Sequence, residues 1–166
     1  MDNQMDQTND HLEPRSNTSS VQLLAGFARQ DRRDLLAQGR PFQVDLLETF
    51  MSQGDRDLSL YIVLTGGVSA WRDGVMIANL SVGDVLNETK MFLPRPNQYS
   101  ARAETQDTTL LRLPRASLLT YFRDRPERLL KVFVLNIVAV LAQKVEDREE
   151  SIIAGLMPSL SLSEEA

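Results

Sequence analysis

The residues best suited to hold a ligand lie together between Gly83 and Ala103. This stretch carries a carboxylate at Glu88, guanidinium groups at Arg95 and Arg102, and a side-chain amide at Asn97. Its pattern predicts a strand, a turn, a short helical turn and a second strand. It lies in the middle of a region with strong β patterning, where a small barrel would hold any ligand.

Composition excludes several kinds of catalytic and metal site. The 166-residue chain has no cysteine and a single histidine, His11. Thiolate catalysis, a histidine-based triad and a zinc site of cysteines or several histidines are therefore ruled out. A metal enzyme of the cupin type would need histidine ligands on its barrel strands, and no predicted strand carries one. We expect neither an enzyme, nor a metal site, nor a cofactor.

Charge and hydropathy limit the compartment and the partners. The net charge is −5 and no basic stripe offsets it, which argues against a nucleic-acid-binding domain. No apolar run approaches the ~20 residues needed to cross a bilayer. The first 20 residues lack the features of a secretory signal. We expect a cytoplasmic protein that contacts neither DNA nor a membrane.

Hydrophobic patterning predicts one mainly β domain with flanking helices. Helical spacing covers 21–38, and Asp73-Gly74 is a hairpin signal. A short helix is predicted at 117–122. Strands are predicted at 42–44, 58–64, 68–71, 75–78, 100–103 and 108–113, and another short element begins at 46–47 and leads through Phe50 to a turn at 52–55. Short antiparallel strands at this spacing indicate a β-barrel or jelly roll.

The chain divides into three parts by composition. Residues 1–20 are polar and predict a disordered leader, with a partner-binding peptide as the alternative. Residues 21–145 form the domain, including the start of a long C-terminal helix. Residues 146–166 hold the end of that helix, expected to stop at Pro158, and a polar tail.

The long helix carries a candidate dimer seam. Val138, Leu141, Val145 and Ile152 recur at intervals typical of a coiled coil, although Arg148 interrupts them. We expect a homodimer through this helix. Packing of the same residues on the barrel within a monomer is the alternative.

The order of short motifs resembles a cyclic-nucleotide-binding domain of the catabolite-activator type. The resemblance covers roughly residues 23–144. Its motifs are Q-G-D at 53–55, L-Y-I-V-L-T-G-G-V at 60–68, V-G-D-V-L-N-E at 82–88, P-N-Q-Y-S-A-R-A at 96–103 and R-P-E-R-L-L at 125–130. It implies a β-barrel or jelly roll followed by a long helix.

The resemblance also assigns roles within the family's phosphate-binding cassette. There a glycine lets backbone N–H groups approach the cyclic phosphate, a glutamate takes the ribose hydroxyl, and an arginine pairs with the phosphate. Here Glu88 stands at the glutamate position, and Pro96 follows at the expected spacing. We refer to residues 83–100, from Gly83 to Ser100, as the cassette.

Other cassette positions depart from the family pattern. Asn87 replaces the glycine, Asn97 replaces the arginine, and Gln98 and Tyr99 replace two small residues. Losing a charge-assisted contact of this kind costs about 2–3 kcal/mol, roughly 30- to 100-fold in affinity. Arg95 and Arg102 are the candidate substitutes for the missing arginine.

These departures predict a non-enzymatic regulatory or adaptor module with a degenerate cassette. It would not bind cAMP or cGMP in the usual way, and would act in signalling through dimerisation and contact with a protein partner. The alternative is a sensor for a cyclic nucleotide or a cyclic dinucleotide such as cyclic di-GMP. Gln143 and Lys144 are candidates for a lid over the pocket, as the resemblance implies. The chain ends about where the helix-turn-helix domain of such transcription factors would begin, so DNA binding is not expected.

Overall fold

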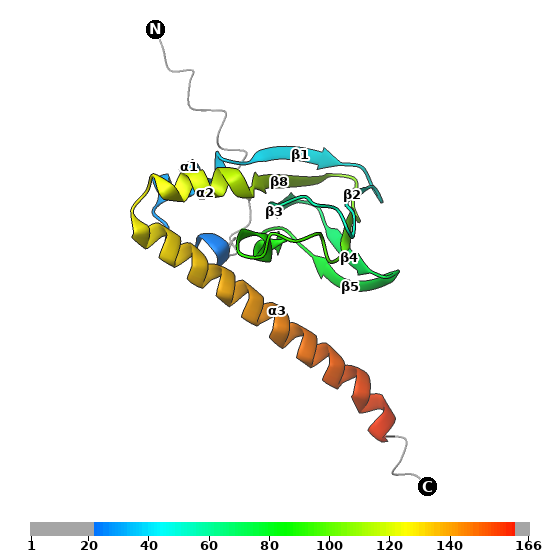
Figure 1. Ribbon diagram of the computed structural model, residues 1–166. Helices are drawn as coiled ribbons and strands as arrows, with labels where there is room; N and C mark the ends of the chain where they lie inside the picture. The colour runs from blue at the N-terminus through cyan, green and yellow to red at the C-terminus, as the bar shows by residue number, and fades with distance from the viewer. Residues whose placement is uncertain (1–21, 162–166) are drawn as a thin grey trace.

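Two four-stranded antiparallel sheets face each other and carry helices at one end (Figure 1). The computed structural model describes residues 22–161, with side chains described for 22–151. The predictions for the leader at 1–20 and for the side chain of Ile152 lie outside these ranges. The jelly roll predicted from the strand pattern is confirmed, as is the long helix that follows it.

The strands pair across large sequence separations. One sheet has the order β1-β8-β3-β6 and the other β2-β7-β4-β5. The strands are β1 (Arg40–Val44), β2 (Thr49–Met51), β3 (Ser59–Thr65), β4 (Val68–Arg72), β5 (Val75–Leu80), β6 (Val85–Leu86), β7 (Ser100–Ala103) and β8 (Thr108–Pro114). Asp73 and Gly74 both have positive φ, 51° and 80°, as the predicted two-residue hairpin turn requires.

The helices flank the strands in sequence. They are the 3-10 turn η1 (Gln22–Leu24), α1 (Arg29–Leu36), the 3-10 turn η2 (Glu88–Met91), α2 (Arg115–Arg123) and α3 (Glu127–Ser161). The helical pattern over 21–38 therefore forms two short elements. Gly26, with φ of 77°, lies between them in a conformation that glycine adopts easily.

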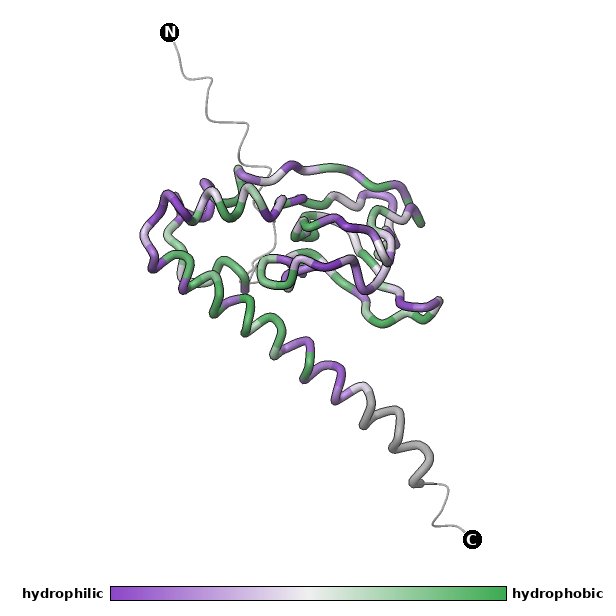
Figure 2. The backbone as a smooth tube through the Cα atoms, in the orientation of Figure 1, coloured by the Kyte–Doolittle hydropathy of each residue, from purple (hydrophilic) through white to green (hydrophobic). Residues whose placement is uncertain are grey.

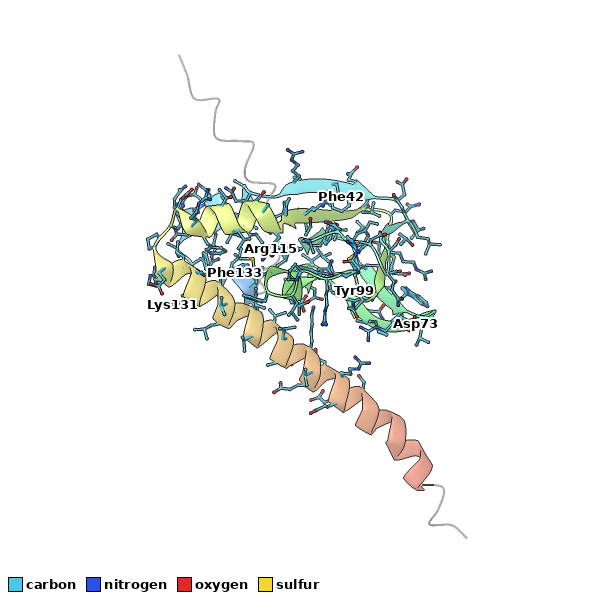
Figure 3. All side chains as sticks on the ribbon, viewed as in Figure 1. Phe42, Asp73, Tyr99, Arg115, Lys131 and Phe133 are labelled. Atoms are coloured by element: carbon cyan, nitrogen blue, oxygen red, sulfur yellow. The ribbon has the colours of Figure 1, made fainter. Side chains whose placement is uncertain are left out.

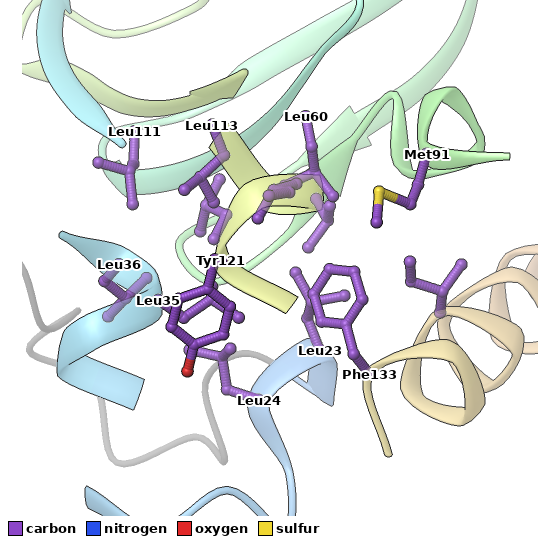
Figure 4. Packing of buried hydrophobic residues seen from close by; sticks show 14 of the residues in the cluster. Leu23, Leu24, Leu35, Leu36, Leu60, Met91, Leu111, Leu113, Tyr121 and Phe133 are labelled. Atoms are coloured by element: carbon purple, nitrogen blue, oxygen red, sulfur yellow. The ribbon is translucent and has the colours of Figure 1, made fainter. Parts of the chain in front are cut away.

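Strand β3 is buried on both faces, and it separates two hydrophobic cores. Its Leu60 and Ile62 pack in the first core with the helices, where Figure 4 shows Leu60 above Leu23 and Phe133. Its Tyr61 and Val63 pack in the second core, between the two sheets. This two-sided burial explains why 58–64 is the most apolar strand of the sequence.

The first half of α3 is fixed to the domain. Phe133 and Ile137 are fully buried in the first core. The side-chain amide of Asn136 donates to the backbone oxygens of Leu23 and Ala25, at 2.9 and 2.8 Å. Figure 2 shows hydrophobic residues along this half and hydrophilic ones farther along, where Figure 1 shows the helix extending beyond the sheets.

Two local predictions were wrong. Residues 46–47 form no strand: Leu47 has a positive φ of 64°, and the segment is an exposed turn between β1 and β2. The helix does not stop at Pro158 but continues to Ser161. A proline lacks one backbone donor, which weakens a helix locally without necessarily ending it.

No helix in the described residues is long and apolar enough to span a bilayer. Within the same residues, no group of three or more histidine, cysteine or acidic side chains could hold a metal ion.

Candidate functional site

The cassette runs from the turn before β6 to the start of β7. Gly83 has a φ of 94°, and its backbone N–H donates to the oxygen of Val63 on β3 at 2.8 Å. The chain then forms β6 and η2, and β7 begins at Ser100. The left-handed conformation at Gly83 explains the glycine there, because it brings the turn onto β3 at little steric cost.

Asn87 has the backbone conformation that favours glycine. Its φ is 60°, in the left-handed region, which asparagine tolerates better than most residues. Its backbone N–H donates to the hydroxyl of Tyr99 at 3.1 Å. Tyr99 therefore takes up a donor at the position where, by the family resemblance, the backbone faces the phosphate.

The Tyr99 hydroxyl is neutral at physiological pH, as that of an unperturbed tyrosine already is. Burial raises the pKa of Tyr99 far above its ordinary value, and the nearby negative charge of Glu88 raises it further. Figure 3 shows Tyr99 among the side chains close to the sheets. A neutral hydroxyl is compatible with accepting the Asn87 N–H, and it supplies no charge to replace the missing arginine.

Asn97 is buried and engaged within the cassette. Its side-chain oxygen accepts a hydrogen bond from the amide of Asn87 at 3.1 Å, and its own amide donates to the backbone oxygen of Ser52 at 3.3 Å. Its backbone also bonds to the turn between β2 and β3, through Gly54 at 2.8 Å and Asp55 at 2.7 Å. Asn97 thus fixes this turn to the cassette.

Glu88 is paired with a lysine from the long helix. Its side chain is 6% exposed, and one carboxylate oxygen lies 2.7 Å from Nζ of Lys144. The same Nζ donates to the backbone oxygen of Val85 at 2.7 Å. The carboxylate that the family resemblance assigns to a ribose hydroxyl is therefore occupied by α3.

Further cationic side chains hold backbone oxygens of the cassette. Lys90 donates to the oxygen of Arg95, Arg72 donates to that of Gln98 at 3.0 Å, and Arg115 donates to that of Met91 at 3.1 Å. Burial lowers the pKa of Lys90, and the charge of Arg95 lowers it further.

Sequence reasoning missed this set of cations. Arg72 and Arg115 lie outside the cassette in sequence, and the only available signal was their place next to a predicted hairpin and after the last strand.

The candidate substitute arginines differ in their surroundings. Arg102 alternates with the buried Ala101 and Ala103, so it lies on the face of β7 away from the second core. It pairs there with Glu104 at 2.8 Å, and its guanidinium lies 4.4 Å from the centre of the Trp71 ring. The side chain of Arg95 is exposed.

The remaining predicted pocket residues lie at the edge of the cassette. Gln98 is exposed and donates to the oxygen of Pro96 at 3.0 Å. The hydroxyl of Ser100 accepts the backbone N–H of Gln53 at 2.9 Å. Gln143 donates to Asp147 along α3 at 2.9 Å, so of the two lid candidates Lys144 is the one bonded to the cassette.

The proposed seam residues of α3 have different environments. Val138 and Val145 are 56% and 57% exposed, and Leu135, one turn before Val138, is 66% exposed. Leu141 instead packs against the first core. The exposed row on α3 is therefore Leu135, Val138, Ala142 and Val145, with Leu141 on the side facing the domain.

Comparison with known proteins agrees with this architecture. Residues 44–125 match the family model of the cyclic nucleotide-binding domain. The chain is 23% identical over 120 residues to the Pycsar effector protein XpPycTIR of Xanthomonas perforans, covering 72% of this chain and 38% of that protein. It thus spans well under half the length of this relative.

Solved structures show the same fold. The catabolite activator protein of Thermus thermophilus is 26% identical with a TM-score of 0.66, over 83% of this chain and 63% of that one. A cyclic nucleotide-binding domain from Methylobacillus flagellatus is 20% identical with a TM-score of 0.71, over 78% and 74%. Residues 44–125 therefore match the cyclic nucleotide-binding domain in sequence, and the chain shares the fold of these solved structures.

Proposed function

We propose that this protein is a non-enzymatic regulatory module whose cassette is occupied by its own side chains. The observation that carries the proposal is the hydrogen bond from the Asn87 backbone N–H to Tyr99, at 3.1 Å. With it, Asn97 is bonded to Asn87 and Glu88 to Lys144. The groups that would bind a cyclic nucleotide in the family thus have partners within the chain.

A cyclic nucleotide would have to displace these contacts without compensation. The buried Asn87 and Asn97 would each lose partners, and each unsatisfied buried group costs about 1–3 kcal/mol. No arginine stands at position 97 to pair with the phosphate. The module then acts through its surfaces, as a homodimer joined by α3 that contacts a protein partner in signalling.

Isothermal titration with cAMP and cGMP tests the proposal. The native chain is expected to show no binding in the micromolar range. The variant Asn87→Gly/Asn97→Arg/Tyr99→Ala restores the family's residue types and is expected to bind cAMP measurably. The matched control Gln98→Arg adds the same charge at an exposed neighbouring position and should leave binding undetectable. Micromolar binding by the native chain would sink the proposal.

A second candidate function is a sensor for a cyclic nucleotide or cyclic dinucleotide. The pair Glu88–Lys144 favours it, because a ligand that took Glu88 would release Lys144 and so loosen α3 from the cassette. The same titration with cyclic di-GMP separates the two functions. Saturable binding that is lost in Glu88→Gln supports the sensor, and absence of binding by any of these nucleotides supports the occupied cassette.

A further inference from the structure

A cavity lies apart from most of the cassette. It has a volume of about 820 Å³ and is lined by residues of β1, β2, β3 and β8 and of the segments beside them. Of the cassette residues, Asn97 is the one in its lining. The volume falls within the ~300–1,000 Å³ typical of sites for small molecules.

Aromatic rings form one wall of this cavity. Phe42, Phe50 and Tyr61 contact one another, with ring centres 5.6 to 6.1 Å apart and tilted or edge-on geometry. Tyr61 is 3% exposed, whereas both phenylalanines are half-buried and retain accessible ring surface. Figure 3 shows Phe42 on β1. Such a wall suits a planar aromatic ligand.

Two arginines line the same cavity as cross-strand neighbours. Arg40 on β1 is directly opposite Arg112 on β8 in the register of the sheet. Like charges placed opposite each other in this way are destabilising unless something balances them. The alternation of β1 puts Arg40 on the same face as Phe42, so its charge and the aromatic wall belong to one surface.

The charge of these arginines is only partly neutralised. Nη2 of Arg112 lies 3.0 Å from the carboxylate of Asp57, and its Nε donates to the hydroxyl of Ser59. Asp57 also accepts a hydrogen bond from the hydroxyl of Tyr61. Within residues 22–151, no side-chain hydrogen bond or ion pair is formed by Arg40. Of the two arginines, Arg112 is the one paired with a carboxylate among these residues.

We propose that this cavity binds a small planar aromatic molecule that carries an anionic group. The ring lies against Phe42, Phe50 and Tyr61, and the anion lies between Arg40 and Arg112. Arg112 has further N–H donors for it, because a guanidinium group has five and two are used by Asp57 and Ser59. Besides Asp57, the lining contains the acidic residue Asp55. The test must therefore distinguish an anionic ligand from a cationic one.

Two probes that share the same aromatic ring but carry opposite charges test whether the cavity prefers an anionic ligand. Isothermal titration of the full chain uses indole-3-acetate and tryptamine. Indole-3-acetate is expected to bind saturably, and at least tenfold more tightly than tryptamine. Equal affinities, tighter binding of tryptamine, or no saturable binding of indole-3-acetate would overturn the proposal.

Variants locate the bound probe. Arg40→Gln should lower the affinity for indole-3-acetate about tenfold, as expected for loss of a charge-assisted hydrogen bond. Arg40 is exposed, so the fold should be unaffected. The matched control Arg32→Gln, at an exposed arginine of α1, should leave the affinity unchanged. Phe50→Leu should weaken binding, and Tyr99→Phe in the cassette should not. Unchanged affinity in both Arg40→Gln and Phe50→Leu would overturn the proposed site.

Discussion

Lys144 on α3 lies 2.7 Å from the carboxylate of Glu88 in the cassette, which joins the long helix to the centre of the domain. The pair is unequal in exposure, with Glu88 6% and Lys144 40% exposed. Replacing the lysine leaves the buried carboxylate of Glu88 without its partner, and an unpaired buried charge lowers stability.

Lys144→Gln is therefore expected to lower the free energy of unfolding by about 1–3 kcal/mol, less than for a fully buried pair because the lysine is partly exposed. Urea denaturation measures it. Lys131→Gln is the matched control, because Lys131 pairs with Glu127 at the surface of the same helix, and should change stability by less than about 0.5 kcal/mol. Equal losses of unfolding free energy in the two variants would mean that the pair with Glu88 contributes no more to stability than a surface pair.

Tyr99→Phe should expose the Asn87 backbone N–H to exchange. The hydroxyl is the acceptor recorded for that N–H, and phenylalanine keeps the ring while removing it. Amide hydrogen exchange followed by NMR is expected to show faster exchange at Asn87 than in the native chain. Tyr121→Phe, which removes a hydroxyl bonded to Asp31, should leave the Asn87 amide unchanged. Unaltered protection in Tyr99→Phe would contradict the proposed role of Tyr99.

Protonation of Asp57 should lower the stability of the protein in acid. Burial acts to raise its pKa, but hydrogen bonds from Tyr61, Ser59 and Arg112 outweigh it and hold the pKa below the ordinary value of 3.8. A carboxyl with a lowered pKa in the folded state contributes stability above its unfolded pKa and loses it as the pH falls through the folded pKa.

Urea denaturation at pH 6 and pH 3 measures this contribution. The loss of stability between the two should be smaller in Asp57→Asn than in the native chain. Asp107→Asn, at an exposed turn, should keep the native pH dependence. An unchanged loss in Asp57→Asn would show that other carboxyl groups dominate acid unfolding.

Val138→Glu should separate the proposed homodimer. Val138 is 56% exposed on the row that also carries Leu135 and Val145, so a charge there would be buried between two helices in a dimer but solvated in a monomer. Light scattering is expected to show dimer mass for the native chain and monomer mass for the variant. Gln143→Glu introduces the same charge off this row and should remain dimeric. A native monomer, or a dimeric Val138→Glu, would argue against this seam.

Much of the fold could be predicted because its signals are local. The apolar run at 58–64, the Asp73-Gly74 turn and the apolar start of the last helix each depend on neighbouring residues, and each element formed where expected. Leu47 was misassigned because hydrophobicity alone does not report a positive φ.

The site was predictable by position but not by contact. Spacing placed Glu88 and Asn97 in the cassette, and the family resemblance named Lys144 as a lid candidate without naming Glu88 as its partner. Nothing in the sequence directed Arg72 and Arg115 to cassette carbonyls. In the cavity lined by β1 and β8, the placement of Arg40 opposite Arg112 depends on strand register, and such pairing across distant strands has no local signal.

The two-sided burial of β3 limits how this domain can move. A slip of β3 by one residue would turn the hydroxyl of Tyr61 toward the helices and bring Leu60 and Ile62 between the sheets, so both cores oppose it. Strand β3 is therefore held in one register relative to the elements on its two sides. For the proposed regulatory function, we therefore expect rotation or release of α3 relative to β3, rather than sliding of the sheet.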